Sequence, residues 1–249
     1  MITHYVREYL LENIPEKKIA DLRIGLKYTG VLLHDGNAGV AYTFRDGLPE
    51  GCSAFGGYLP LAGKSTHELL RYIGASLLVE SSVGIATANA LTNSERGEQN
   101  VGDVLDVLEL GREDRVGMVG FFGPLVAPLR KRARELIIFE QTNEIAPGLL
   151  PAEKAPEGLP GCDVALITST SLINGTLDSL IESSQKCREI VLLGASTLLL
   201  PELFKPLGVT LLSGVVVTDP PGILQVISEG GGMRFFKNHI KKVNIRVQG

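Results

Sequence analysis

Five short apolar stretches recur in the second half of the chain, and each is separated from the next by a segment long enough for a helix. They read RVGMVG, ELIIFE, DVALITS, EIVLLG and GVVVTD, and none alternates polar with apolar residues. Strands that are buried on both faces have this uniform pattern, and parallel strands need helix-length connections. We therefore expect an α/β fold with a Rossmann-like parallel sheet over residues 115–249.

The first hundred residues have a different pattern. Strand-like stretches broken by turn-forming glycines predict an antiparallel meander over residues 19–44. Further on, Ser65 and Glu68 make a capping box that starts a helix. The small side chains of residues 81–91 predict a buried helix, which packs either within its domain or across a dimer axis. The expected parts are a small α+β domain (1–100), a connecting helix (101–114) and the Rossmann-like domain (115–249).

The composition restricts the partners of the chain. Its net charge is -4 and its pI is near 5.7, so we expect no nucleic acid and no anionic membrane as a partner. The amino terminus lacks the uninterrupted apolar core of a signal peptide, and no apolar run is long enough to span a bilayer. These features predict a cytoplasmic protein whose partner is a small molecule, and they leave a homodimer open.

The carboxyl ends of the predicted strands carry small or polar residues. In an open parallel sheet, ligands bind at these ends. Hydroxyl groups there also cap helices, so a structural role is the alternative for each. Two amides of the small-residue helix, Asn89 and Asn93, serve either packing or a pocket wall. The strand-end candidates for ligand binding are Gly120, Phe122, Gly123, Pro124, Glu140, Ser169, Thr170, Asn174 and Ser196.

The first strand-end loop differs from a dinucleotide-binding turn. Its glycines have a G-x-x-G-x-x-G spacing, whereas the dinucleotide fingerprint is G-x-G-x-x-G. Pro124 and Pro128 each remove an amide donor, and we expect the helix to begin only at Pro128. A diphosphate cradle is therefore not expected. Glu140 is placed to accept hydrogen bonds from ribose hydroxyls, so an adenosine-type ligand without a diphosphate stays open beside an exposed strand-end acid.

Residues suited to acid–base, nucleophilic or metal chemistry are few. The four histidines are scattered, without the spacing of a metal-binding helix, so we expect no metal site. The distant cysteines Cys52, Cys162 and Cys187 favour buried thiols over a disulfide or a zinc site. Cys52 lies in a glycine-rich loop with no histidine near it, which disfavours a nucleophile. We assign no catalytic residue and no cofactor, and whether the protein is an enzyme stays open.

Three segments carry a resemblance to a known family. They are VGIATANALTN, TSTSLINGTLDSL and the run from VLLGASTLLL to GGGMRFFK. On these segments the chain resembles the heavy-metal chelation family, in which an enolase amino-terminal-like domain precedes a Rossmann-like domain of unknown function. The resemblance implies a pocket between the two domains, lined by the candidates above. It also implies a role in making or processing metal chelators of pterin, flavin or siderophore type.

Three functions stay open on these grounds. The first is an enzyme that acts on such a small molecule in the interdomain cleft. The second is a non-catalytic binding protein for a metal complex or small ligand, favoured by the shortage of acids, bases and nucleophiles. The third is an S-adenosylmethionine-dependent transferase, which rests on Glu140 and the glycine loop.

Overall fold

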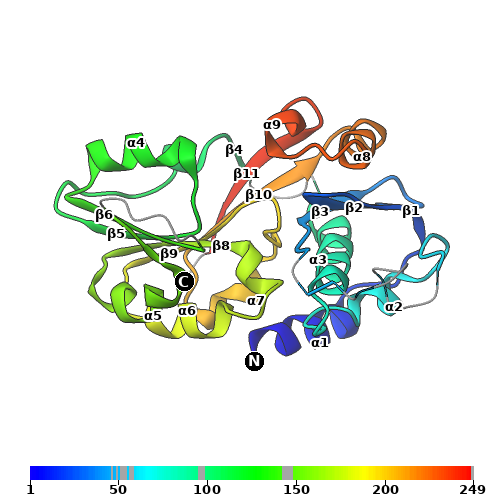
Figure 1. The fold of residues 1–249 in the computed structure, drawn as a ribbon, viewed down its shortest axis with the longest axis horizontal. Helices are drawn as coiled ribbons and strands as arrows, with labels where there is room; N and C mark the ends of the chain where they lie inside the picture. The colour runs from blue at the N-terminus through cyan, green and yellow to red at the C-terminus, as the bar shows by residue number, and fades with distance from the viewer. Residues whose placement is uncertain are drawn as a thin grey trace.

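The structure of the protein is a computed structural model. The residues it describes are 1–45, 47–48, 50, 55, 59–94, 99–141 and 148–247. Among these residues the strands form one sheet of three strands and one of eight. Each sheet is the centre of a lobe, and the lobes lie side by side (Figure 1). Both lobes contribute to one hydrophobic core cluster, and no described helix has the length and apolar character needed to cross a membrane.

The smaller sheet is the antiparallel meander expected over residues 19–44. Its strands pair in chain order, and Gly30 of the central strand pairs with Arg23 on one side and Val40 on the other. The predicted cap is present, because the Ser65 hydroxyl accepts a hydrogen bond from the Glu68 N–H at 3.2 Å. The elements of this lobe are α1 (Ile2–Asn13), β1 (Ile19–Ile24), β2 (Tyr28–Leu33), β3 (Ala38–Tyr42), α2 (Thr66–Leu70) and α3 (Leu78–Thr92).

Helix α3 packs on one face of the meander with almost no space between the backbones. A Cβ atom at Gly39 would lie 2.1 Å from the Ala90 nitrogen and 2.5 Å from the Ala86 oxygen. The small residues of the helix are buried within the chain. This close packing answers the question left by the sequence, since the small-residue face is used inside the lobe.

The opposite face of the meander is covered by a helix from the far end of the chain, α8 (Pro220–Ser228). Two glycines make room for it. A Cβ atom at Gly25 would lie 2.3 Å from the Ile227 oxygen, and one at Gly30 would lie 2.8 Å from a Leu224 methyl carbon. The meander is therefore the middle layer between α3 and α8 (Figure 1). The short α9 (Met233–Phe236) follows α8.

The larger sheet contains the five predicted parallel strands and three further strands. Its order is β4-β11-β10-β9-β8-β5-β6-β7. Neighbours from β10 to β7 are parallel, whereas β11 is antiparallel to both β10 and β4. The strands are β4 (Asn100–Val101), β5 (Arg115–Val119), β6 (Glu135–Glu140), β7 (Leu149–Pro151), β8 (Val164–Thr168), β9 (Glu189–Leu193), β10 (Leu211–Val217) and β11 (Ile240–Arg246).

The prediction of a connecting helix over residues 101–114 is wrong. The segment begins with β4, whose backbone groups pair with the sheet edge at β11 and not within a helix. Gly102, at φ 146°, then turns the chain away from helical geometry. A 3₁₀ turn at Val104–Asp106 follows, capped by the carboxylate of Asp103. Sheet pairing and the glycine together override the helical spacing of the apolar residues.

The helix predicted to begin at Pro128 begins earlier. Helix α4 runs over Gly123–Arg132, with Pro124 in its first turn and Pro128 in its interior. The fixed φ of Pro124 suits a first turn, where the missing N–H has no helical partner. Pro128 removes one internal hydrogen bond, but the buried Leu125 and Leu129 anchor the helix on the sheet.

Helices cover both faces of the larger sheet. In Figure 1, α4 lies on one face, and α5 (Ala155–Gly158), α6 (Leu177–Ser183) and α7 (Pro201–Phe204) lie on the other. Numbered along the chain from β5, the strands from β7 to β10 read 3-2-1-4-5-6, which is the order of doubly wound sheets that bind dinucleotides. The order reverses between β5 and β8, and ligands of such sheets bind at the carboxyl ends beside this point.

Candidate functional site

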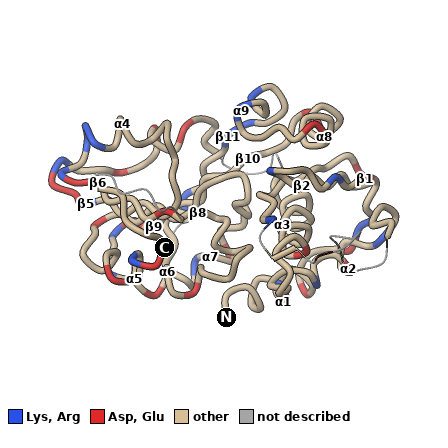
Figure 2. Tube along the Cα trace, in the orientation of Figure 1, with Lys and Arg blue, Asp and Glu red and all other residues tan. Residues whose placement is uncertain are grey.

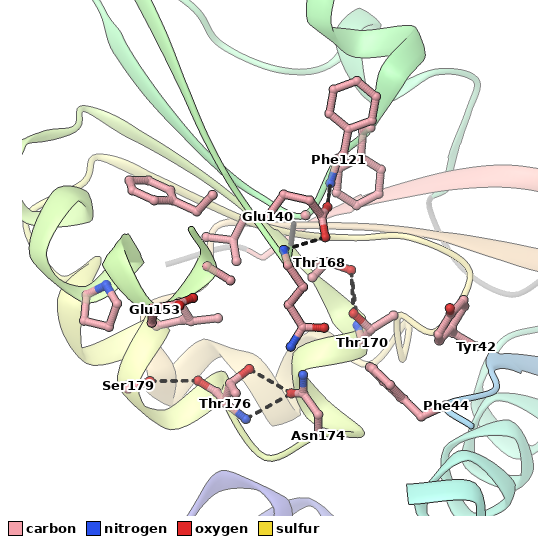
Figure 3. Close-up of a pocket in the computed structure, with 18 residues that line it drawn as sticks. Tyr42, Phe44, Phe121, Glu140, Glu153, Thr168, Thr170, Asn174, Thr176 and Ser179 are labelled. Atoms are coloured by element: carbon pink, nitrogen blue, oxygen red, sulfur yellow. Dashed lines mark hydrogen bonds between the residues drawn. The ribbon is translucent and has the colours of Figure 1, made fainter. Parts of the chain in front are cut away.

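A pocket of about 460 Å³ lies at the carboxyl ends of β5, β6 and β8. Figure 3 shows strand ends and the segment before α6 on one side, and two aromatic rings of the smaller lobe on the other. Of the sequence candidates, Gly120, Phe122, Glu140, Thr170 and Asn174 line it. The other lining residues are Tyr42, Phe44, Val119, Phe121, Phe139, Gln141, Ala152, Glu153, Pro156, Thr168, Thr176, Ser179 and Leu180.

The carboxylate of Glu140 turns back onto the loop between β5 and α4. Its Oε2 accepts a hydrogen bond from the Phe121 N–H at 2.5 Å, and its Oε1 accepts one from the Gln141 N–H at 2.8 Å (Figure 3). The loop turns sharply at Gly120, whose φ is 90° and whose missing Cβ leaves room for the side chain of Thr168. The acid at the end of β6 therefore holds the loop in place.

Hydroxyl and amide groups form the opposite side of the pocket. Thr168 and Thr170 share a hydrogen bond between their hydroxyls at 2.9 Å. The cap position of the following helix, α6, is Thr176. The Asn174 Oδ1 accepts hydrogen bonds from the Thr176 N–H at 3.2 Å and hydroxyl at 2.8 Å. This fixes the side chain so that its amide nitrogen points into the pocket (Figure 3).

The aromatic wall comes from the carboxyl end of β3. Tyr42 and Phe44 pack edge to face with ring centroids 5.1 Å apart, and both line the pocket. Behind them the ring of Tyr28 contacts Tyr42 at 5.9 Å and Phe236 of α9 at 4.9 Å. The wall is thus supported by an aromatic cluster that reaches from the pocket to α9.

Because Tyr28 of this cluster is buried, the protein should lose folding stability at alkaline pH. Burial, followed by the nearby Tyr42, raises the pKa of Tyr28 to about 12. A raised tyrosine pKa contributes stability that is complete below the unfolded value near 10 and is lost as the pH rises towards 12. Between pH 9 and pH 11 this loss should amount to about 1 kcal/mol, and Tyr28→Phe should abolish it. Urea unfolding at pH 9 and pH 11 would measure this, with Tyr5→Phe at a half-exposed tyrosine as the control. Equal alkaline losses in Tyr28→Phe and the wild type would contradict it.

Three candidates lie at the edge of the pocket or beneath it. Gly123 and Pro124 form the first turn of α4 and are not among the lining residues. Ser169 is buried below the pocket, where its hydroxyl lies 2.7 Å from the Thr197 hydroxyl. Ser169 therefore links the ends of β8 and β9, which is the structural alternative left open by the sequence.

Ser196 and Asn89 lie at the contact between the two lobes. The Ser196 hydroxyl accepts a hydrogen bond from the Tyr42 N–H at 2.9 Å, and so ties the segment after β9 to the aromatic wall. The Asn89 amide donates to the Val40 carbonyl at 2.8 Å and to the Ala195 carbonyl at 3.4 Å. Its Oδ1 is buried and accepts no hydrogen bond from the described residues.

Asn93 connects the two lobes through both ends of its side-chain amide. Its amide donates to the carbonyls of Thr197 at 2.8 Å and Val215 at 3.2 Å, and its Oδ1 accepts from the Leu199 N–H at 2.8 Å. The side chain is almost fully buried. Asn89 and Asn93 thus bind the lobes together behind the pocket and do not line it.

Several lining residues were not predicted from the sequence. Tyr42 and Phe44 have only a weak signal, an aromatic pair at the end of a predicted strand. Glu153 belongs to a 3₁₀ turn (Ala152–Lys154) after β7. The hydropathy pattern of the sequence does not predict β7, which has three residues. Thr176 and Ser179 lie on the rim before and within α6. Their signal is a row of hydroxyl residues after the third apolar stretch.

The pocket lining is acidic. It contains Glu140 and Glu153, and it contains no lysine, arginine or histidine among the described residues. The nearest basic run in sequence, Arg130 to Arg132, is exposed in the last turn of α4, at the end of the helix away from the pocket loop (Figure 2). Among the described lining residues, a ligand in this pocket would therefore meet two carboxylates and no positively charged side chain.

Metal-ligating side chains do not converge in the part of the chain that the structure describes. No three His, Cys, Asp or Glu residues there are placed to hold one metal ion. Cys162 and Cys187 are buried free thiols, and burial raises the pKa of Cys187 to about 11, which favours the thiol over the metal-binding thiolate. Cys52 lies outside the described residues. The donor set of the described residues does not fit a protein-bound heavy metal.

Comparisons with known proteins identify the family of this chain. Two family models, both described as "Putative heavy-metal chelation", match residues 103–246 and 7–92. An uncharacterized protein of Methanocaldococcus jannaschii is 27% identical over 260 residues, which cover 100% of this chain and 99% of that protein.

Two solved structures of proteins with unknown function have the same fold. One, from Pyrococcus horikoshii, has a TM-score of 0.87 at 24% identity and covers 99% of this chain and 100% of its own. The other, from Desulfitobacterium hafniense, has a TM-score of 0.80 at 25% identity and covers 98% of both chains. The first family model alone spans more than half of the sequence. The chain therefore belongs to the family whose models are described as "Putative heavy-metal chelation".

Proposed function

We propose that the protein binds a small, planar, neutral or positively charged organic molecule in the pocket between the lobes. The observation that carries the proposal is the pocket lining, whose described residues combine aromatic rings, hydroxyls and two carboxylates without a basic side chain. A volume of about 460 Å³ lies within the usual range for small-molecule sites. An anionic ligand would find no partner of opposite charge in this lining.

The ligand class follows from the groups on each side. Phe44 and Tyr42 offer ring faces and edges to a flat heterocycle. The amide nitrogen of Asn174 offers a donor, and the hydroxyl of Thr170 offers both a donor and an acceptor. Pterins and flavins without phosphate groups have this shape and polarity. A metal would reach such a site as part of an organic complex that supplies most of the ligating atoms.

A second function, an enzyme acting on the same class of molecule, is favoured by Glu153. Its carboxylate lines the pocket and makes no hydrogen bond or ion pair with a described residue, so it is free to act as a general base or acid. A transferase that uses S-adenosylmethionine is less favoured, because both oxygens of Glu140 already accept backbone hydrogen bonds.

A thermal-shift screen with pterins, flavins, adenosine, S-adenosylmethionine and their metal complexes tests the proposal. A true ligand at a hundred times its Kd should raise the Tm by roughly 5 °C. Phe44→Ala should weaken binding about fivefold, since stacking contacts are worth about 1 kcal/mol. Phe235→Ala, at an exposed ring on α9, is the control. A shift that survives Phe44→Ala unchanged would place the ligand elsewhere.

Mass spectrometry of the same mixtures separates binding from catalysis. If the protein is an enzyme, a product accumulates, and Glu153→Gln stops it while leaving the thermal shift in place. If it is a binding protein, the ligand is recovered unchanged. A screen in which no planar neutral or cationic molecule raises the Tm would argue against the pocket as a ligand site.

A further inference from the structure

We propose that Glu140 sets the charge selectivity of the pocket by supplying an internal anion where doubly wound sheets commonly hold a phosphate. The inference rests on the proposed function and names the residue that excludes phosphorylated ligands from it. The loop between the first strand and the first helix of such sheets binds phosphate through its backbone N–H groups. In this chain that loop follows β5, and a carboxylate is already hydrogen-bonded to it.

The position of Glu140 makes this possible. It is the last residue of β6, which pairs with β5 up to the match of Val119 with Phe139. One step beyond that match its side chain reaches the loop, where Oε2 lies 2.5 Å from the Phe121 nitrogen. Helix α4 begins two residues later and has no side-chain cap. The carboxylate therefore lies on the loop that leads into the amino-terminal end of α4.

The remaining donors of the loop are limited. Pro124 contributes no N–H to the first turn, and the Gly120 N–H donates to the Phe139 carbonyl at 2.8 Å. The N–H groups of Phe122 and Gly123 have no acceptor among the described residues. They are donors that a phosphate could use only next to the negative charge of Glu140. Repulsion between these like charges would weaken the binding of an anion to the loop, and no lysine or arginine of the described lining compensates for it.

Isothermal titration calorimetry of the full chain with inorganic phosphate and with AMP tests this. Glu140→Gln removes the charge and keeps one oxygen that can accept from the Phe121 N–H, while its amide nitrogen cannot accept from the Gln141 N–H. The contact that holds the loop is thereby retained. Glu140→Gln should bind both anions at least about tenfold more tightly than the wild type. Glu140→Ala, which removes the whole carboxylate, should behave in the same way. Circular dichroism would confirm that each variant is folded.

Glu153→Gln is the matched control, because it removes one charge from the same pocket without touching the loop amides. Its affinity for the two anions should change less than threefold. An equal gain in anion affinity in Glu153→Gln and Glu140→Gln would overturn the inference. The total charge of the pocket, and not the position of Glu140, would then determine anion binding. No gain in either Glu140 variant would overturn it as well. If Glu140→Gln gains phosphate binding while no neutral or cationic heterocycle binds the wild type, the proposed function fails and the role of Glu140 stands.

Discussion

Asn93→Ala is expected to lower the free energy of unfolding by about 4 kcal/mol. The substitution leaves the Leu199 N–H and the carbonyls of Thr197 and Val215 without their partner in a buried contact between the lobes. Each buried group that loses its partner costs about 1 to 3 kcal/mol. Urea unfolding followed by circular dichroism measures the loss. It would also show whether the transition stays cooperative when the contact between the lobes is weakened.

Two comparison variants sharpen this test. Asn89→Ala should cost only about 1 to 2 kcal/mol, because Asn89 makes one short and one long hydrogen bond and its Oδ1 has no partner among the described residues. Asn93→Asp has the same shape as the wild type, but it would bring a carboxylate oxygen against the two carbonyls. It should therefore be at least as destabilising as Asn93→Ala. Equal stability of the Asn89 and Asn93 alanine variants would show that the hydrogen bonds of Asn93 do not hold the lobes together.

Gly39→Ala should lower the free energy of unfolding by about 3 kcal/mol, the upper range for an overpacked core. The added methyl group would lie 2.1 Å from the Ala90 nitrogen and 2.5 Å from the Ala86 oxygen. Both are backbone atoms of α3, so relief requires the helix to move away from β3. The urea midpoint should fall accordingly.

Gly36→Ala in the same hairpin is the control. Gly36 has a φ of 88° and open space around it, so alanine there costs only backbone strain, about 1 kcal/mol. If the two alanine variants were equally stable, close packing of α3 on the meander would not be a major source of stability.

The parts of the fold that the sequence predicted are those with a strong local pattern. Five uniformly apolar stretches became five parallel strands, because a sheet covered on both faces requires apolar residues throughout. The strands β4 and β7 have two and three residues, too few for any periodicity. In β11, the segment IKKVNIR has two adjacent lysines exposed and two buried residues after them, so its pattern is neither a clean alternation nor an apolar run.

The sequence predicted those residues of the candidate site whose position follows from the direction of the strands. The carboxyl ends of parallel strands meet at one edge, which is why Gly120, Glu140 and Thr170 line one pocket. The aromatic wall depends instead on how the meander docks against the larger sheet, a long-range contact with no local signal. The same limit applies to Ser196, because the sequence does not indicate that its hydroxyl accepts the Tyr42 N–H.

The position of α8 also affects how the chain is made. The meander is complete once β3 has been synthesised, yet one of its faces is covered by a helix that lies more than 170 residues further on. At a translation rate of about 5 to 20 residues per second, roughly 10 to 40 seconds pass between the synthesis of the meander and the synthesis of α8. During this time the surface around Gly25 and Gly30 is open to solvent and to other nascent chains. Conditions that slow translation should therefore favour aggregation of this protein before α8 has left the ribosome.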